Sequence, residues 1–206
     1  RCRSGPTDAS SSAASDVYER QEKGEAPVVA LFASCRASTN VFATLCSSKG
    51  PTDAYVVSAL ASWIWELGHP RVVIQSDGEP AIVAMVAAVR ARVIADGRAE
   101  QVTCQVSPVG SHGSNGAAER AVQQLRGMAR VYLDFVKERT GVNFPAKSNW
   151  WSWALRHAAL LYNRFHVRAD TRMTPYSKMR HRNYAHAARP FGYVGVATRP
   201  GSHLQE

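Results

Sequence analysis

Two acidic residues stand in settings that suit metal-assisted chemistry. Asp77 follows the short apolar run Val72–Ile74, which predicts an acid at the exit of a buried strand. Glu119 comes three residues after Gly116, where a helical period begins, which predicts an acid in the first turn of a helix. Carboxylates on separate elements can converge on divalent metal ions, and such ions drive phosphoryl transfer. These two residues therefore indicate an enzyme that cuts or joins nucleic acid.

Each acid also fits a purely structural role. Asp77 precedes Gly78, and Asp-Gly is common turn chemistry. A glutamate in the first turn of a helix, such as Glu119, complements the helix macrodipole. The second role is compatible with catalysis, because one carboxylate can serve both. The functional interpretation of Asp77 therefore depends on its pairing with Glu119.

The distribution of charge points to an anionic partner. The net charge is +9 at pH 7, and residues 1–119 hold 10 Lys and Arg against 12 Asp and Glu, whereas residues 120–206 hold 15 against 4. A basic surface attracts phosphate backbones with salt-dependent, sequence-independent affinity. The alternative is that the Arg-rich helices are merely solvated.

The size and composition of the chain fit one folded domain. A hydrophobic content of 45% is enough for a core, and 206 residues fit one large domain with tails.

The cysteines and the ends of the chain indicate an intracellular fragment. Four widely spaced cysteines form no CxxC pair, so we expect reduced thiols and neither a disulfide framework nor a zinc site. No apolar run approaches the roughly 20 residues that span a bilayer, so no membrane association is expected. The start, Arg1-Cys2-Arg3-Ser4, has no initiator Met and no signal-peptide core, which suggests a piece of a longer chain.

Hydrophobic periodicity predicts an α/β domain. Residues 1–15 are rich in Ser, Ala and Gly and are expected to be a disordered lead-in. Residues 16–166 are expected to form the core domain, and residues 167–206 a basic, mostly irregular extension. Within the core, the expected strands are 16–21, 28–34, 41–45, 72–74 and 102–106, and the expected helices are 54–67, 80–95, 117–139 and 150–164. This order predicts a five-stranded mixed sheet with helices on both faces.

Four segments fall in an order that resembles a known family. They are Lys49-Gly50, Asp77-Gly78-Glu79, Ser114-Asn115-Gly116-Ala117-Ala118-Glu119 and Thr174-Pro175-Tyr176. From about Asp16 to Met179, the chain resembles the catalytic core of retroviral and retrotransposon integrases, which has the ribonuclease H-like fold. The 41 residues between Asp77 and Glu119 exceed the usual spacing in that family, and we expect the extra length around residues 96–100.

The resemblance implies a catalytic and metal-binding triad of Asp16, Asp77 and Glu119. These residues would hold two Mg²⁺ or Mn²⁺ ions for 3′-end processing and DNA strand transfer. Asp16 is the expected first acid, Asp8 is a weaker candidate, and loss of the first acid is the third possibility. The resemblance also implies DNA partners (element ends and target DNA), a homo-oligomer, a nuclear site of action, and a retrotransposon polyprotein with an upstream zinc-binding module.

Contacts to nucleic acid are expected near Glu119. Gln123 and Arg126 follow it by four and seven residues, so they share its helix face, and Arg130 continues the same stripe. Asn115, in the preceding loop, is a substrate contact or a helix cap. Two other functions stay open: a catalytically decayed copy that only binds nucleic acid, and a ribonuclease H-like nuclease that hydrolyses without joining.

Overall fold

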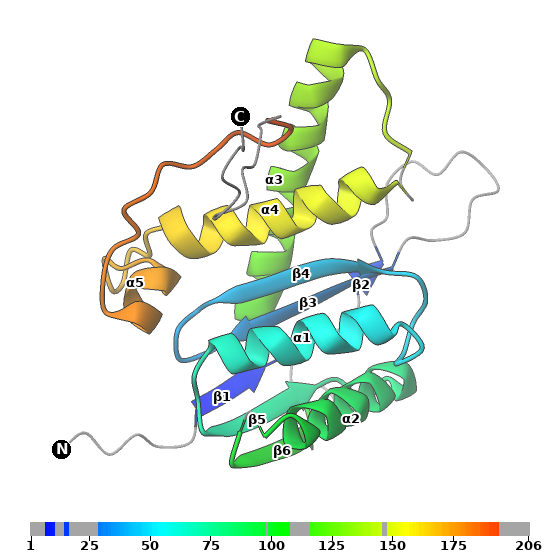
Figure 1. Cartoon of the computed structure of the whole chain (residues 1–206), viewed down its shortest axis with the longest axis vertical. Helices are drawn as coiled ribbons and strands as arrows, with labels where there is room; N and C mark the ends of the chain where they lie inside the picture. Colours follow the sequence, from blue (N-terminus) through cyan, green and yellow to red (C-terminus); the bar gives the residue numbers. More distant parts are fainter. Residues whose placement is uncertain are drawn as a thin grey trace, which may run out of the picture.

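The computed structural model describes residues 7–10, 15–16, 29–97, 99–107, 116–145 and 148–193. One sheet occupies the middle of the molecule, with two helices on each of its faces and a short fifth helix beside them (Figure 1). The predicted loop at 108–115, which includes Asn115, and most of the predicted strand 16–21 lie outside the described residues.

The sheet is mixed, as its sequence pattern predicts. Its six strand segments are β1 (Thr7–Ser10), β2 (Ser15–Asp16), β3 (Val29–Cys35), β4 (Val41–Cys46), β5 (Arg71–Ser76) and β6 (Gln101–Val106). β1, β5 and β6 run parallel, and β3 pairs antiparallel with β1, β2 and β4. The predicted number was five. The difference arises because β1 and β2 both pair with β3, so they act as two pieces of one strand.

One face of the sheet is covered by α1 (Ala54–Glu66) and α2 (Pro80–Ala95). The other face is covered by α3 (Gly116–Thr140) and α4 (Asn149–Phe165). β3 shows why the two cores stay separate. Its residues Leu31, Ala33 and Cys35 pack with α1 and α2, whereas Ala30 and Phe32 pack with α3 and α4. This strict alternation makes β3 a strand buried on both sides.

Local signals set the helix ends. Asp53 is the N-cap of α1, and its carboxylate accepts a hydrogen bond from the Val56 N–H at 3.3 Å. Burial raises the pKa of Asp53, but hydrogen bonds led by those from Ser47 outweigh it, so the pKa is lowered. The Cys46 thiol lies close to this cap. Its burial, together with the nearby negative charge of Asp53, raises the pKa of Cys46 to about 11. α2 begins at Pro80, where a missing N–H costs nothing.

The first fifteen residues are not simply a lead-in. Thr7–Ser10 and Ser15 lie in strands, and β1 sits between β3 and β5 inside the sheet. The prediction of a disordered segment was wrong here because β1 contains no large apolar residue, so it gives no alternating signal. Its place depends on backbone pairing along both of its edges.

The basic extension also contains more structure than predicted. α5 (Pro175–Arg180) begins at the N-cap Thr174, whose side chain accepts a hydrogen bond from the Ser177 N–H, and ends at His181 in the left-handed conformation. Residues 181–193, which we name the strap, then run past the C-terminal end of α4 and reach α3 (Figure 1). Phe191 of the strap stacks on Tyr132 of α3 at 5.8 Å between ring centroids. None of the described helices is both long and apolar enough to span a membrane.

Candidate active site

Asp77 lies directly after β5, at the edge of the sheet where the parallel strands end. It is half-buried, and its Oδ1 accepts a hydrogen bond from the Glu79 N–H at 3.3 Å. This bond closes the turn that leads into α2. The other carboxylate oxygen is not used by that turn, so Asp77 can serve the turn and present an oxygen ligand at once.

Glu79 does not share the site of Asp77. Its Oε1 forms an ion pair with Lys49 Nζ at 3.1 Å, which ties the start of α2 to the segment before α1. The pair therefore links two neighbouring loops, and it explains structurally why an acid follows so closely after Asp77. As partly exposed charges, the two residues contribute little to stability.

A row of polar side chains crosses the sheet beside Asp77. Arg36 donates from Nη2 to Oε1 of Gln75 at 3.0 Å, and Gln75 donates from Nε2 to Oγ of Ser107 at 3.0 Å. Gln75 lies two residues before Asp77, and side chains two residues apart along an extended chain point to the same side. This part of the sheet therefore carries polar side chains, whereas the rest of the sheet contributes apolar side chains to the cores. The sequence gives no signal for Arg36, Gln75 and Ser107, since nothing in their spacing links them before the sheet forms.

Glu119 lies in the first turn of α3 and is exposed. The predicted stripe continues along this helix: Gln123 is exposed, and Arg126 and Arg130 are half-buried. The buried side of α3 carries other residues, among them Leu125 and Leu133. The stripe is therefore separate from the core, and it starts at the acid that the sequence singled out.

Asp8 is set back from Asp77 along the sheet. β1 pairs with β5 in parallel, and Asp8 lies opposite Val73. Asp77 lies four residues beyond Val73, just past the end of β5. At about 3.3 Å per residue, the backbone of Asp8 is roughly 13 Å short of the level of Asp77.

Asp16 lies beyond that level. It is opposite Val29 in β3, whereas Ser10 is opposite Ser34, five residues away along β3. Asp16 is therefore roughly 16 Å past Ser10, while Asp77 is only about 7 Å past it, at the same rise per residue. The level of Asp77 falls between the two acids, and residues 9–15 of the sequence contain only Ala and Ser.

The acids fit a metal ion in part. Mg²⁺ is commonly held by one or two carboxylates together with water and substrate phosphate, which Asp77 and Glu119 can supply. Within the described part of the chain, no group of three or more His, Cys, Asp or Glu side chains could hold an ion. The backbone register also places Asp16 away from Asp77. Asp77 and Glu119 are thus of the donor type that Mg²⁺ prefers, and the expected triad of Asp16, Asp77 and Glu119 stays a prediction.

Comparison with known proteins identifies the fold. No protein-family model and no curated protein matches the sequence. Among solved structures, the HTLV-2 integrase catalytic core, a trimeric form in complex with magnesium, matches with a TM-score of 0.56 and 13% identity over 84% of this chain and 95% of that chain. The catalytic core of BIV integrase matches with a TM-score of 0.55 and 15% identity over 86% and 95%.

The chain has the fold of a retroviral integrase catalytic core. A third match, in the intasome of simian T-cell lymphotropic virus, has a TM-score of 0.59 and 17% identity over 96% of this chain and 63% of that chain. The resemblance seen in the sequence, and the α/β class with a ribonuclease H-like arrangement, are confirmed at the level of fold. At these identities the likeness says nothing about individual catalytic residues.

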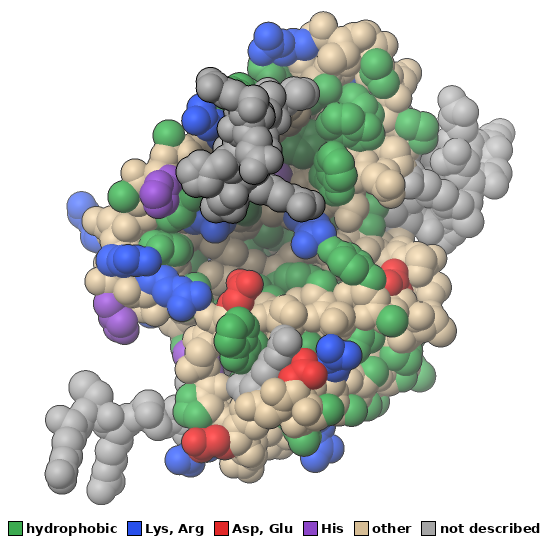
Figure 2. All heavy atoms as spheres, in the orientation of Figure 1, with side chains coloured by type: hydrophobic (Ala, Val, Ile, Leu, Met, Phe, Trp, Pro, Cys, Tyr) green, Lys and Arg blue, Asp and Glu red, His purple; other side chains and the backbone are tan. Residues whose placement is uncertain are grey.

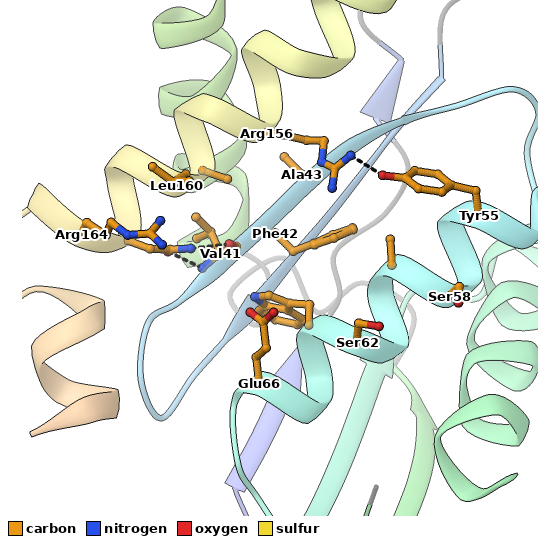
Figure 3. A pocket seen from close by; sticks show the side chains of 14 residues that line it. Val41, Phe42, Ala43, Tyr55, Ser58, Ser62, Glu66, Arg156, Leu160 and Arg164 are labelled. Atoms are coloured by element: carbon orange, nitrogen blue, oxygen red, sulfur yellow. Dashed lines mark hydrogen bonds between the residues drawn. The ribbon is translucent and has the colours of Figure 1, made fainter. Parts of the chain in front are cut away.

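A separate cleft of about 570 Å³ lies between α1 and α4, along β4 (Figure 3). Tyr55 of α1 and Arg156 of α4 meet across it, where the guanidinium donates to the phenol oxygen. Glu66 and Arg164 lie at its other end (Figure 3). None of the predicted site residues lines this cleft, so it is distinct from the candidate active site.

Proposed function

We propose that this domain transfers phosphoryl groups on DNA in the manner of an integrase core, with Asp77 and Glu119 as its metal ligands. The observation that carries the proposal is the coincidence of fold and position. In a chain with the integrase-core fold, one acid directly follows β5 and another lies in the first turn of α3, where the sequence resemblance implies catalytic acids.

The chemistry needs no covalent intermediate with the protein. A water molecule or a DNA 3′-hydroxyl attacks the phosphorus, and the bond to the leaving oxygen breaks as the new bond forms. Bound Mg²⁺ or Mn²⁺ would supply charge neutralisation at the attacking and leaving oxygens. Asp77 and Glu119 would hold the ions through their carboxylates, and the two rigid elements that carry them would fix their positions.

The basic half of the chain would hold the DNA. Gln123, Arg126 and Arg130 would contact phosphates along the stripe of α3, and Asn115 would contact DNA from the loop before it. On the face shown in Figure 2, Lys and Arg side chains gather around α5 and the neighbouring end of α4. Action on DNA implies a nuclear location, and joining two DNA ends implies a homo-oligomer; both belong to the proposal.

The first test uses a labelled duplex oligonucleotide with Mg²⁺ or Mn²⁺. The proposal expects products longer than the substrate, which show joining, and loss of these products in Asp77→Asn. Shortened products alone would instead indicate a nuclease that hydrolyses without joining. Asp16→Asn and Asp8→Asn identify the first acid, since only a true metal ligand abolishes the reaction when it is replaced.

The register of β1 favours a second candidate, a domain that binds DNA without catalysis. Neither Asp8 nor Asp16 is level with Asp77, as expected of a decayed copy that has lost its first acid. For that candidate we expect folded protein that binds DNA and gives no metal-dependent product. The oligonucleotide assay with a parallel binding measurement separates the two candidates.

A further inference from the structure

Two adjoining hollows lie where α3 crosses the C-terminal end of α4. The first, of about 370 Å³, is charged; its lining includes Arg120, Gln124, His166, Arg168 and Asp170. The second, of about 390 Å³, is mostly apolar; its lining includes Met128, Leu161, Phe165 and Ala188. Gln124, Tyr162 and His166 line both. Each hollow lies within the size range of about 300–1,000 Å³ typical of ligand sites.

The wall between the two hollows is rigid. The imidazole of His166 stacks on the ring of Tyr162, with centroids 4.4 Å apart and planes 13° from parallel. Its Nδ1 is 3.3 Å from Nε2 of Gln124 on α3, and its backbone N–H donates to the Tyr162 carbonyl at 3.0 Å. Tyr162 is buried, so His166 is the ring of this pair that a planar ligand could cover.

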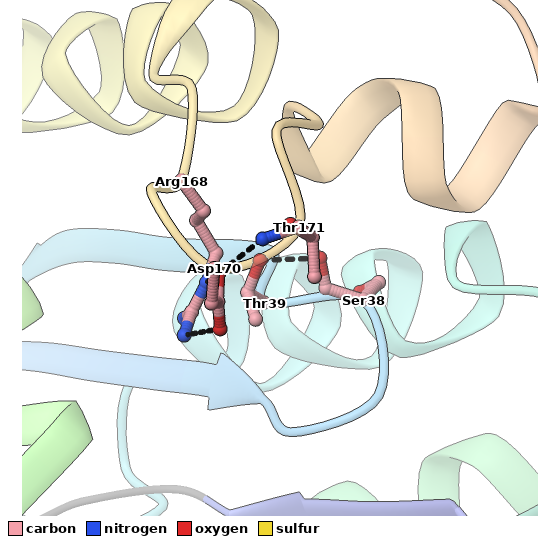
Figure 4. Close-up of polar contacts among 5 residues, drawn as sticks. All are labelled: Ser38, Thr39, Arg168, Asp170 and Thr171. Atoms are coloured by element: carbon pink, nitrogen blue, oxygen red, sulfur yellow. Dashed lines mark hydrogen bonds and ion pairs between the residues drawn. The ribbon is translucent and has the colours of Figure 1, made fainter.

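The first hollow carries positive charge in a fixed place. Asp170 accepts hydrogen bonds from Nε and Nη2 of Arg168 at 2.9 and 2.7 Å, and from the Thr171 N–H at 2.8 Å (Figure 4). Asp170 thereby holds the Arg168 guanidinium in place. The charged side chains that line the hollow are two arginines, Arg120 and Arg168, and one aspartate, Asp170. Arginine suits phosphate because the guanidinium carries several N–H donors, of which Asp170 uses those of Nε and Nη2 on Arg168.

The second hollow offers an apolar surface with a fixed outer wall. Phe165 is 42% exposed, so its ring is available to a ligand. Ala188 belongs to the strap, which is held on both sides of that residue. On one side, the guanidinium of Arg164 lies 4.8 Å from the ring centroid of Tyr184, and on the other, Phe191 stacks on Tyr132.

We propose that the two hollows together bind one unpaired nucleotide of DNA, with its phosphate in the charged hollow and its base in the apolar one. This inference rests on the DNA substrate of the proposed function. Stacking favours an unpaired nucleotide, because a base inside a duplex already has both faces covered by its neighbours. Arg120 directly follows Glu119, so the bound nucleotide would lie beside the candidate active site.

The test measures binding of fluorescently labelled DNA by anisotropy in the presence of a chelator, so that no reaction intervenes. Two probes are compared: a blunt duplex, and the same duplex with a short single-stranded tail. We expect the unaltered domain to bind the tailed probe at least about fivefold more tightly, which is the lower end of what stacking one base provides. Equal affinity for the two probes would overturn the inference.

Three variants locate the effect. His166→Ala removes the stacking surface, Arg168→Gln removes one of the two arginine charges that line the charged hollow, and Ala188→Leu fills the apolar hollow without deleting any contact. Each is expected to lose most of the preference for the tail. Arg92→Gln is the matched control, because Arg92 also pairs with an aspartate, Asp96, but lies on α2. Folded variants that keep the full preference would overturn the inference, and Ala188→Leu decides if the other two fail to fold.

The outcomes also separate this inference from the proposed function. Glu119→Gln is expected to keep the preference for the tail, since that carboxylate takes no part in it. If the tail preference is present but no metal-dependent reaction occurs, the proposed catalysis fails and the nucleotide site stands. If the unaltered, folded domain binds neither probe, both fail.

Discussion

At the scale of single residues, the sequence predicted the elements that carry Asp77 and Glu119, and the role of Asp16 as the third acid stays a prediction. Both acids have local signals, an apolar strand before one and a helical period after the other, and both lie where those signals placed them. The position of Asp16 depends on the pairing of β2 with β3, which no local signal encodes. The same reason applies to the polar row of Arg36, Gln75 and Ser107. The sequence does not predict this row, because only the folded sheet brings the three side chains together.

His157 supports a prediction about pH at this scale. Burial lowers its pKa, and its Nε2 is buried without a hydrogen-bond partner among the described residues. The unfolded chain therefore binds more protons than the folded one just below the ordinary histidine pKa of about 6.5, so stability falls as pH falls through that value. His157→Phe keeps a ring between Tyr132 and Phe191 and should remove part of this dependence.

The measurement is the urea midpoint of unfolding at pH 8 and at pH 5.5. The drop in midpoint should be smaller in His157→Phe than in the unaltered domain. Burial also lowers the pKa of His69, so we expect His69 to account for the drop in urea midpoint that remains in His157→Phe. An equal drop in both proteins would show that His157 is not held in its neutral form.

At the scale of elements, residues that start or stop a helix decided which helix bounds the sequence could predict. α2 runs over the predicted residues because Pro80 starts it and Gly97 follows it. α5 was missed although Thr174 and Pro175 form a good helix start, since a six-residue helix has no usable period. β1 was missed for the opposite reason: its small side chains carry no pattern, and its position in the sheet follows from backbone pairing.

The cap of α1 gives a prediction at the element scale. Asp53→Ala leaves the Val56 N–H without its acceptor and frees Ser47, so it should lower the free energy of unfolding by about 1 kcal/mol. Chemical denaturation measures this loss. Asp53→Asn keeps a capping oxygen and serves as the control. Because the pKa of Asp53 is lowered on folding, its contribution should also fade as pH falls below about 4. Equal stability of Asp53→Ala and the parent would contradict the cap.

At the scale of the whole molecule, the reliable signals were the order of strands and helices along the chain and the distribution of charge. Alternating strands and helices predicted a mixed sheet with helices on two faces, and solved integrase cores share that fold. The excess of Lys and Arg after residue 119 corresponds to α3, α4, α5 and the strap, which form one side of the molecule (Figure 1). What composition does not encode is the register that aligns acids from distant strands.

The basic half supports a prediction about salt. Affinity for duplex DNA should fall steeply with salt concentration, because each neutralised phosphate releases counterions. Arg126→Gln and Arg130→Gln should each reduce the slope of log affinity against log salt by about 1. Arg139→Gln is the control, because this residue lies in the last turn of α3 over the ring of Phe135. Unchanged slopes in the first two variants would remove the stripe from the DNA-binding surface.

The most direct test of the central claim compares Glu119→Gln with Glu138→Gln in the metal-dependent joining of a labelled oligonucleotide. Both variants remove one carboxylate from an exposed position on α3, at opposite ends of the helix, so they match in charge and setting. We expect Glu119→Gln to abolish the reaction while the domain stays folded, and Glu138→Gln to retain it. Joining by Glu119→Gln at the level of the parent would contradict the assignment.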